Sequence, residues 1–239
     1  MHFEIDPRIF AEFPGARVGV VAARGLDNRG DGAEIRRLLA AEERRVAEEL
    51  AGVAVVEHPH IAPWRDAYRR FGAKPKKYRS SIENLVRRAL KGNPLPSINP
   101  LVDLYNAVWL RHLLPVGGES LERITGSIEL TFAGESEAPV RLLGERQERP
   151  PHPGEVIYRD AAGAICRRWN WKEAERTKLT PETRDAVLVI EALPPAGEAQ
   201  LDAALADLAG LIERFCGGRL ARHQLYDGRP GLDLEEEIR

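Results

Sequence analysis

Three polar side chains interrupt an otherwise apolar stretch near the middle of the chain. Asn99, Asp103 and Asn106 are spaced by four and three residues, so they share one face of the helix predicted over residues 99–110. The remaining positions are nearly all apolar, which is typical of a helix buried on most faces. Buried polar groups are costly unless they are hydrogen-bonded or face a wet cavity. The stripe therefore predicts either a structural hydrogen-bond network or the wall of a pocket for a polar ligand.

A second polar constellation belongs to the later part of the chain. Glu191 is a lone carboxylate within the apolar segment 186–193, where it needs a cationic or hydrogen-bond-donating partner. Glu155 begins another predicted strand, and Arg168 and Asn170 lie where a third one ends. Glu191 is interpreted either as a pocket residue beside these side chains or as the ion-pair partner of Arg168. The two interpretations are compatible.

Residues 64–91 are strongly basic. This segment contains ten Lys and Arg residues and only two acidic ones, which gives a local charge of +8 on a chain of net charge −2. Such asymmetry is typical of a phosphate-binding surface, and interleaved aromatic rings offer faces on which an unpaired base can stack. The alternative is a set of helix faces that pair with acidic parts of the molecule. The candidate phosphate- and base-contacting residues are Lys74, Lys76, Lys77, Tyr78, Arg79, Arg87 and Arg88.

Several kinds of chemistry have no motif in the sequence. There is no Gly-x-Ser-x-Gly, no phosphate-cradling glycine loop, and no spaced Cys and His set of the kind that binds zinc. His58 and His60 flank Pro59 without further Cys or His nearby, so they are interpreted as loop residues. We therefore expect no covalent nucleophile, no metal and no cofactor.

The composition is that of an ordinary globular protein. The chain has 239 residues, of which 43% are hydrophobic and 30% charged, and we expect one compact domain over residues 1–239. Two cysteines, Cys166 and Cys216, indicate a reducing compartment, and neither a signal peptide nor a membrane-spanning segment is visible. A cytoplasmic protein is expected. The acidic segment 232–239 is predicted to be a frayed tail.

Helices dominate the first half of the predicted chain and strands the second, which indicates an α+β fold with a mostly antiparallel sheet. A tight turn is predicted over residues 114–118, and residues 53–56 are either a short strand or a helix end. The predicted helices are 33–50, 61–71, 82–91, 99–110 and 199–216. The predicted strands are 3–6, 17–23, 127–132, 140–143, 155–158, 164–169, 186–193 and 220–226.

Several ordered blocks of sequence resemble a known family. They are Tyr-x-x-Phe-Gly-x-Lys-Pro-Lys-Lys-Tyr-Arg-Ser-Ser-Ile-Glu-x-Leu from residue 68, Pro-x-Ile-Asn-x-Leu-Val-Asp-Leu-Tyr-Asn from 96, Leu-Pro-Val-Gly-Gly from 114, Gly-Glu-Val-Ile-Tyr-x-Asp from 154, and Cys-Arg-Arg-Trp-Asn-Trp from 166. Together they resemble the B3/B4 domain, the editing module of the phenylalanyl-tRNA synthetase beta subunit, over roughly residues 60–215. The chain is similar to a freestanding member of this group. Trp109 departs from the smaller residue typical of the synthetase modules, so the pocket shape does not transfer directly.

The resemblance implies a reaction class. The synthetase domain hydrolyses tyrosine wrongly esterified to the phenylalanine tRNA, and freestanding relatives include a deacylase that removes canavanine from the arginine tRNA. It implies a B3/B4-like fold, tRNA as the partner without a membrane or metal, and no cofactor; we expect a monomer. Carried onto this sequence, the candidate catalytic residues are Asp103, Asn106 and Glu191. The candidate pocket residues are Asn99, Tyr105, Glu155, Arg168 and Asn170.

Two other functions fit the same residues. One is a tRNA-binding accessory module without hydrolysis, and the other is a hydrolase of a free small amino-acid derivative. Two carboxylates near one pocket favour a guanidinium-bearing substrate over tyrosine. The substrate's own ribose hydroxyl can replace a protein base, and the sequence leaves that choice open.

Overall fold

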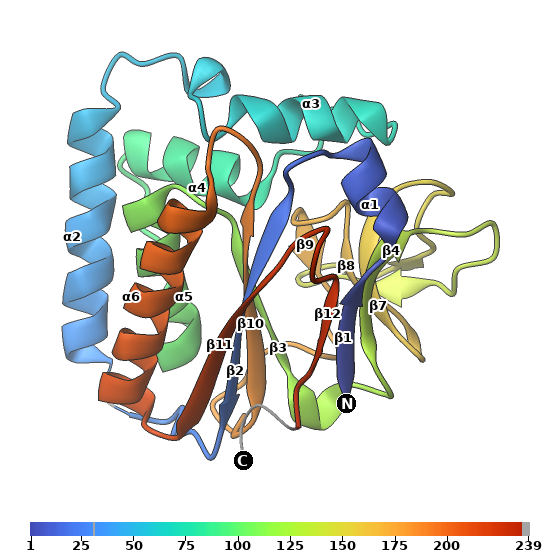
Figure 1. Cartoon of the computed structure of the whole chain (residues 1–239). Helices are drawn as coiled ribbons and strands as arrows, with labels where there is room; N and C mark the ends of the chain where they lie inside the picture. The colour runs from blue at the N-terminus through green and yellow to red at the C-terminus, as the bar shows by residue number, and fades with distance from the viewer. Residues whose placement is uncertain (31, 236–239) are drawn as a thin grey trace.

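Two β-sheets form the centre of the molecule, and helices cover one of them. The computed structural model describes residues 1–30 and 32–235. In Figure 1, helices α2, α4, α5 and α6 lie together on one side, the four-stranded sheet lies in the middle, and the six-stranded sheet lies on the other side. Helix α3 runs across the top of both sheets. The predicted α+β class, with helices concentrated in the first half and mostly antiparallel strands in the second, is confirmed.

The four-stranded sheet is fully antiparallel and holds the most apolar strands. Its order is β11 (Arg219–Leu225), β2 (Arg17–Arg24), β10 (Ala186–Ala192) and β3 (Val116–Ser120). The tight turn predicted over residues 114–118 is wrong, because Val116–Ser120 pairs along β10. Glycines at 117 and 118 gave the segment the composition of a turn, but the backbone there is an extended edge strand.

The six-stranded sheet has the order β12-β1-β4-β7-β8-β9, and only the β1–β4 pair is parallel. Its strands are β1 (His2–Ile5), β4 (Ile128–Phe132), β7 (Val156–Asp160), β8 (Gly163–Arg167), β9 (Lys172–Glu173) and β12 (Gly231–Asp233). Strands β5 (Val140–Arg141) and β6 (Glu148–Arg149) form a separate two-stranded sheet.

The start of the acidic tail is ordered, contrary to the prediction of fraying. Leu232 and Leu234 are buried, and β12 pairs with β1, because these two leucines complete the apolar edge of the six-stranded sheet. The rest of the predicted tail, residues 236–239, lies outside the described residues.

Local sequence signals explain where most helices begin. Helix α3 (Ala62–Arg70) carries Pro63 in its first turn, and helix α4 (Ser81–Leu90) begins at Ser80, whose Oγ accepts a hydrogen bond from the Glu83 backbone amide. The remaining helices are α1 (Pro7–Glu12), α2 (Ala33–Glu49), α5 (Pro100–His112) and α6 (Glu198–Cys216). The segment predicted as a strand or helix end at 53–56 contains a short 3-10 helix, η1 (Val55–Glu57); a second one, η2, spans Leu121–Arg123.

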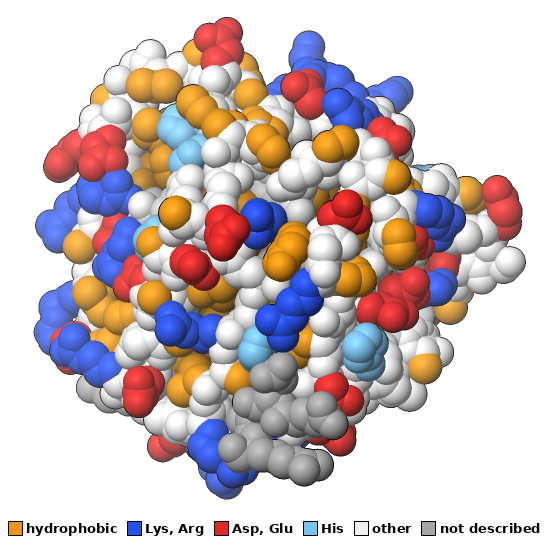
Figure 2. Space-filling model, in the orientation of Figure 1, with side chains coloured by type: hydrophobic (Ala, Val, Ile, Leu, Met, Phe, Trp, Pro, Cys, Tyr) orange, Lys and Arg blue, Asp and Glu red, His pale blue; other side chains and the backbone are white. Residues whose placement is uncertain are grey.

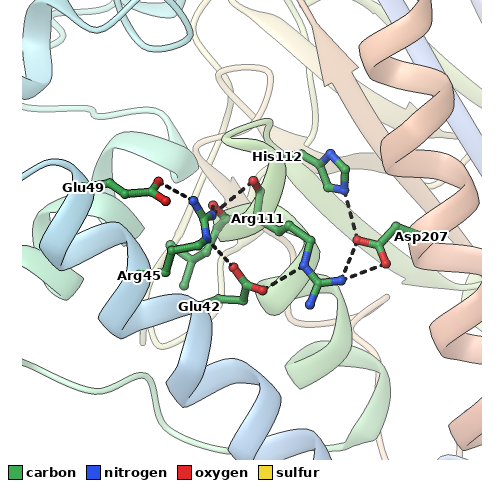
Figure 3. A network of polar contacts seen from close by, with 7 residues as sticks. Glu42, Arg45, Glu49, Arg111, His112 and Asp207 are labelled. Carbon is green, nitrogen blue, oxygen red and sulfur yellow. Dashed lines mark hydrogen bonds and ion pairs between the residues drawn. The ribbon is translucent and has the colours of Figure 1, made fainter.

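Helix α5 is buried on nearly all sides, as its composition predicts. It packs between α2 and α6 and reaches strand β3. Figure 3 shows how its C-terminal end is tied to both neighbouring helices: Arg111 donates to Glu42 of α2 at 2.8 Å and to both carboxylate oxygens of Asp207 of α6 at 2.9 Å. The helical layer is therefore fixed to itself by ion pairs as well as by apolar packing.

The charges on the surface are mostly mixed. On the face drawn in Figure 2, one group of Lys and Arg side chains lies at the upper edge near α3, with Asp and Glu beside it, and other Lys and Arg side chains lie along the left edge.

Candidate functional site

An internal cavity of about 280 Å³ opens between the facing edges of the two sheets. Edge strand β3 and its neighbour β10 supply one wall, strands β7, β8 and β9 supply the opposite wall, and helix α5 closes the inner side with Tyr105 and Trp109. Most of the lining is aromatic or aliphatic, with a few polar groups among it, which is the usual make-up of a small-molecule site. The volume suits a ligand of amino-acid size.

Glu191 lies in the wall of this cavity, on β10. It is almost completely buried, and its two carboxylate oxygens accept hydrogen bonds from the Tyr158 hydroxyl at 2.7 Å and from the Asn170 amide at 2.8 Å. Burial raises its pKa to about 7, while these two hydrogen bonds oppose the rise. A fixed carboxylate with this pKa can exchange a proton near neutral pH.

Asn170 is held in place from two directions. Its side-chain oxygen accepts a hydrogen bond from the Tyr68 hydroxyl at 2.9 Å, and its backbone carbonyl accepts one from the Ser81 amide at 3.1 Å. The two preceding residues, Arg168 and Trp169, have φ values of 50° and 63°. Such left-handed conformations are uncommon for side-chain-bearing residues and persist where the surroundings enforce them. The turn therefore presents Asn170 to Glu191 and Trp169 to the cavity.

Two further carboxylates line the cavity, and neither was among the candidates from the sequence. They are Glu119 on β3 and Glu173 on β9. A backbone amide, that of Gly118, donates to Glu173 at 3.1 Å, and a Cβ added at Gly117 would lie only 2.9 Å from the same Glu173 oxygen. The lack of a Cβ at Gly117 thus leaves room for the Glu173 carboxylate beside this strand. The one sequence signal was a pair of glycines beside a glutamate, and that composition is also typical of a turn.

Burial perturbs both of these carboxyl groups. It raises the pKa of Glu173 to about 7, and burial together with the neighbouring charge of Glu173 raises the pKa of Glu119 well above its ordinary value. Cys166 also lines the cavity, but burial and the nearby carboxylates raise its pKa well above the ordinary value. The thiol therefore stays protonated and is a poor nucleophile.

The rim of the cavity is built from aromatic rings and an arginine. The rings of Tyr78 and Trp171 meet edge to face with centroids 5.0 Å apart, and the Arg168 guanidinium lies 3.7 Å from the Tyr78 centroid and 4.6 Å from that of Trp171. Trp171 lines the cavity, and Ser81, three residues after Tyr78, does so too. The predicted basic loop, residues 74–79, therefore leads directly to the cavity.

The basic residues near this rim fall into two groups. Arg87 and Arg79 approach the buried Glu83, at 2.9 and 3.7 Å, and Arg88 donates to the Pro94 carbonyl. For this group the alternative of internal pairing accounts for much of the charge. The lysines of the loop, Lys74, Lys76 and Lys77, are exposed and form no ion pair with any residue of 1–30 or 32–235. They remain the candidates for phosphate contact.

The polar stripe of helix α5 mostly serves the fold. Asn99 is the N-cap, accepting from the Val102 amide at 3.1 Å and from the side chain of buried Asn28 at 3.0 Å. Asp103 accepts from the Ser97 hydroxyl and, at 2.9 Å, from the Ile98 amide. Asn106 is buried farther along the helix, outside the cavity lining. The structure thus favours the hydrogen-bond network over the pocket wall, because N-capping and loop closure satisfy the first two side chains.

The structure separates the other predicted site residues. Of the eight catalytic and pocket candidates, Tyr105, Asn170 and Glu191 line the cavity. Glu155 is instead buried in an ion pair, receiving hydrogen bonds from Arg167 at 2.6 and 3.0 Å. Arg168 lies 3.5 Å from Glu155, so the predicted Arg168–Glu191 ion pair is wrong. Glu191 meets neutral donors, because the left-handed turn directs the arginine to the rim.

Comparison with known families matches the sequence of this chain to one of them. The model of the B3/4 domain family covers residues 63–217, well over half of the chain. The chain belongs to the B3/4 domain family. All the cavity-lining residues except Phe3 lie within the matched segment, which contains Tyr78, Tyr105, Glu119, Glu173 and Glu191. The resemblance predicted for roughly residues 60–215 is confirmed.

Comparison with solved structures gives a weaker likeness. This B3/4 protein superposes on an N-terminal fragment of the phenylalanyl-tRNA synthetase beta-subunit from Pyrococcus horikoshii with a TM-score of 0.46 and 11% sequence identity. The alignment covers 91% of this chain and 49% of that one, so the chain spans about half the length of the fragment. No curated protein sequence gives a significant match.

Within residues 1–30 and 32–235, no cluster of three or more His, Cys, Asp or Glu side chains has the geometry to hold a metal ion. No helix in those ranges has both the length and the apolar character needed to cross a membrane.

Proposed function

We propose that this protein is a trans-editing aminoacyl-tRNA deacylase, which hydrolyses the ester bond of a mischarged tRNA. The observation that carries the proposal is the cavity of amino-acid size, with Glu191 in its wall and the basic loop 74–79 at its rim. Membership of the B3/4 family supports a tRNA-related role. The cavity would take the amino acid, while the rim would hold the acceptor end of the tRNA.

The rim offers the contacts that an unpaired RNA end requires. Tyr78 and Trp171 supply aromatic faces for stacking of the terminal base, and the Arg168 guanidinium lies against both rings. Lys74, Lys76 and Lys77 would contact the phosphates that precede it. Tyr78, Trp171 and Arg168 lie at the rim, and the three lysines belong to the loop that leads to it. A ribose ester held at the rim could therefore extend its aminoacyl group into the cavity.

Glu191 is the proposed general base. A water oxygen would form a bond to the ester carbonyl carbon as its proton passes to the Glu191 carboxylate. The bond between that carbon and the ribose oxygen would then break, and the proton would return to the departing ribose oxygen, releasing a free amino acid and tRNA. Tyr158 and Asn170 fix the carboxylate, and its pKa of about 7 suits proton transfer at neutral pH. The buried, protonated Cys166 would not form a covalent intermediate.

The test is deacylation of a panel of mischarged tRNAs under single-turnover conditions. The panel includes canavanyl-tRNA for arginine and tyrosyl-tRNA for phenylalanine, each beside its correctly charged form. We expect rapid release from one mischarged species and a loss of at least about 100-fold in Glu191→Gln, the usual contribution of a positioned base. Glu34→Gln, at an exposed glutamate far from the cavity, is the matched control. Cleavage of no ester by a protein that still binds tRNA would replace the proposal with a binding module.

A second experiment separates tRNA substrates from free amino-acid derivatives. The double variant Lys76→Gln with Lys77→Gln should weaken binding of all tRNAs about equally and reduce the slope of log affinity against log salt by about one for each lysine. A hydrolase of free small esters would keep its full activity in this variant. Unchanged tRNA affinity and salt dependence would exclude the loop from phosphate contact.

A further inference from the structure

A groove of about 450 Å³ lies between helices α2 and α4, and none of its lining residues belongs to the cavity. One side of α2 forms one wall, and the end of α4 with the turn after it forms the other. Among the described residues that line the groove, none is aromatic or a large aliphatic, so it lacks the anchor pocket that usually dominates the binding of a protein partner. Its floor consists largely of small residues: Ala40, Ala47, Ala89 and Gly92.

Two arginines line the α2 side of the groove. Arg37 and Arg44 are seven residues apart, so they share one face of the helix and lie about 10 Å apart along its axis. Both are exposed, and neither guanidinium forms an ion pair or a hydrogen bond with any residue that the structure describes. Arg45, which points to α5 instead, is paired with Glu42 and Glu49. The arginines that face the groove therefore keep their charge available for a ligand.

The other charged groups beside the groove leave it positive. Its one carboxylate, that of Glu43, accepts a hydrogen bond from the Leu95 amide at 2.6 Å, which ties it to the loop after α4. Arg88 donates to the neutral Pro94 carbonyl in the same loop at 2.8 and 3.1 Å, so its charge is not compensated there. Lys91 is exposed at the end of α4. The dipole of α4 offsets only about half an elementary charge at this end.

Helix α4 connects the groove with the rim of the cavity. Its first residue, Ser81, lines the cavity, its last turn lines the groove, and its ten residues span about 15 Å. The acidic residue of this helix, Glu83, is buried. Lys and Arg side chains also lie along the edge of the molecule where α2 is drawn in Figure 1 and Figure 2. The exposed residues of α4, spaced by four and three, share one face that leads from the basic loop to the groove: Asn84, Arg88 and Lys91.

We propose that this groove binds the phosphate backbone of the base-paired acceptor stem, while the rim of the cavity holds the single-stranded end. The inference rests on the proposed function, because it assigns a second contact with the same RNA. Guanidinium groups bind phosphate through two parallel hydrogen bonds, and the floor of small residues lets a backbone approach closely. Base-paired RNA is recognised mostly by its shape and its backbone, so the groove contributes affinity rather than sequence preference. Helix α2 precedes the segment that the family model matches, so this wall is a feature of the present chain outside that segment.

The test is the binding of two RNA probes, measured by fluorescence anisotropy at several salt concentrations. One probe is uncharged tRNA, and the other is a single-stranded oligonucleotide that carries only the 3′ end of that tRNA. Arg37→Gln combined with Arg44→Gln should weaken tRNA binding about tenfold at low salt and reduce the slope of log affinity against log salt by about one for each arginine. The oligonucleotide, which reaches only the rim, should bind with unchanged affinity.

Two further double variants serve as controls. Arg219→Gln combined with Arg222→Gln removes the same charge from exposed positions on β11 and should leave the affinity for both probes unchanged. Arg37→Lys combined with Arg44→Lys should restore the salt dependence, because each lysine can also neutralise one phosphate. Restoration by lysine separates the charge of the groove from any effect of the substitutions on folding.

The outcomes separate the groove from the proposed catalysis. Unchanged tRNA affinity in the groove variant, an equal loss for both probes, or an equal loss in the β11 control would overturn the stem contact. Tighter binding of poly-L-glutamate than of tRNA, lost in the groove variant, would assign the groove to an acidic polypeptide instead. Groove-dependent tRNA binding by a protein that cleaves no mischarged tRNA would retain the groove contact and remove the deacylase. Cleavage of a mischarged tRNA with groove-independent affinity would retain the deacylase and remove the groove contact.

Discussion

Two groups of carboxylates in this protein have opposite environments. At the junction of α2, α5 and α6, every carboxylate drawn in Figure 3 meets an arginine: Glu42 and Glu49 meet Arg45, and Asp207 meets Arg111 and also lies 3.0 Å from the His112 ring. In the cavity, the hydrogen-bond partners of Glu119, Glu173 and Glu191 within the described residues are neutral and include the Thr177 side chain, the Gly118 amide, the Tyr158 hydroxyl and the Asn170 carboxamide.

The pKa values follow this difference. Burial alone would raise the pKa of Asp207, but the hydrogen bond from His112 and the charge of Arg111 lower it below the ordinary value. Around Glu191 and Glu173 burial prevails, and each pKa rises to about 7. A matched network holds helices together, whereas unmatched buried carboxyl groups cost stability and are retained where a ligand uses them. Structural and functional acidic residues thus differ in their partners, and variants of residues in either group can test this difference.

The largest expected effect comes from breaking the helical network at Arg111. Arg111→Leu leaves Glu42 and Asp207 without their shared cation, so the free energy of unfolding should fall by about 2–3 kcal/mol, somewhat less than for a fully buried pair because the side chains are partly exposed. Denaturant unfolding at pH 7 measures this loss. Arg214→Gln, which breaks an exposed pair with Glu34, should cost under about 0.5 kcal/mol. Equal losses in the two variants would contradict the assignment of the network as structural.

Replacing a cavity carboxylate by a neutral amide should instead raise the free energy of unfolding. The folded-state pKa of Glu173 is raised from 4.5 to about 7, so the protonated form is favoured on folding. Its contribution to stability is complete below pH 4.5 and is lost as the pH rises through 7. Glu173→Gln cannot lose that proton, and its Oε1 can still accept from the Gly118 amide. The variant should therefore exceed the parent by about 2 kcal/mol at pH 8, with the difference vanishing near pH 4.5.

A variant of Asp207, which is ion-paired with Arg111, provides the control for this effect. Asp207→Asn should be destabilising across pH 5–8 by a nearly constant amount, because the lowered pKa of Asp207 keeps it charged throughout that range. Denaturant unfolding of both variants, measured at several pH values, would distinguish structural from functional carboxylates. A Glu173→Gln variant less stable than its parent at pH 8 would show that the cavity carboxylates serve the fold.

The sequence carried enough information to find Glu191 and Asn170 but not Glu119 and Glu173. Glu191 could be found because a carboxylate in an apolar run is conspicuous, and Asn170 because it lies in the same motif as the turn that presents it. Glu119 and Glu173 could not, because β3 has the composition of a turn and β9 has only two residues. The cavity exists only where the edges of two sheets meet, and no local period or motif encodes that meeting.

The polar stripe on α5 was conspicuous in the sequence, but its residues do not line the cavity. Asn99, Asp103 and Asn106 share a helix face, but spacing cannot reveal whether a partner on another segment satisfies them. Asn28, more than seventy residues earlier in the chain, accepts from the Leu101 amide and donates to Asn99, and no feature near the stripe announces this long-range contact. The helix itself, its N-cap and its burial follow from local composition, whereas the role of its polar residues depends on tertiary partners.

The smallest expected effect tests to which class Asp103 belongs. Asp103 is buried like the cavity carboxylates, but it accepts hydrogen bonds from Ser97 and Ile98 and lies outside the cavity. Asp103→Asn weakens two charge-assisted hydrogen bonds and should lower the free energy of unfolding by about 1 kcal/mol. It should leave the single-turnover rate of deacylation unchanged, in contrast to Glu191→Gln. A rate loss approaching that of Glu191→Gln, without a matching loss of stability, would move Asp103 into the functional class and show that hydrogen-bond satisfaction alone does not separate the two.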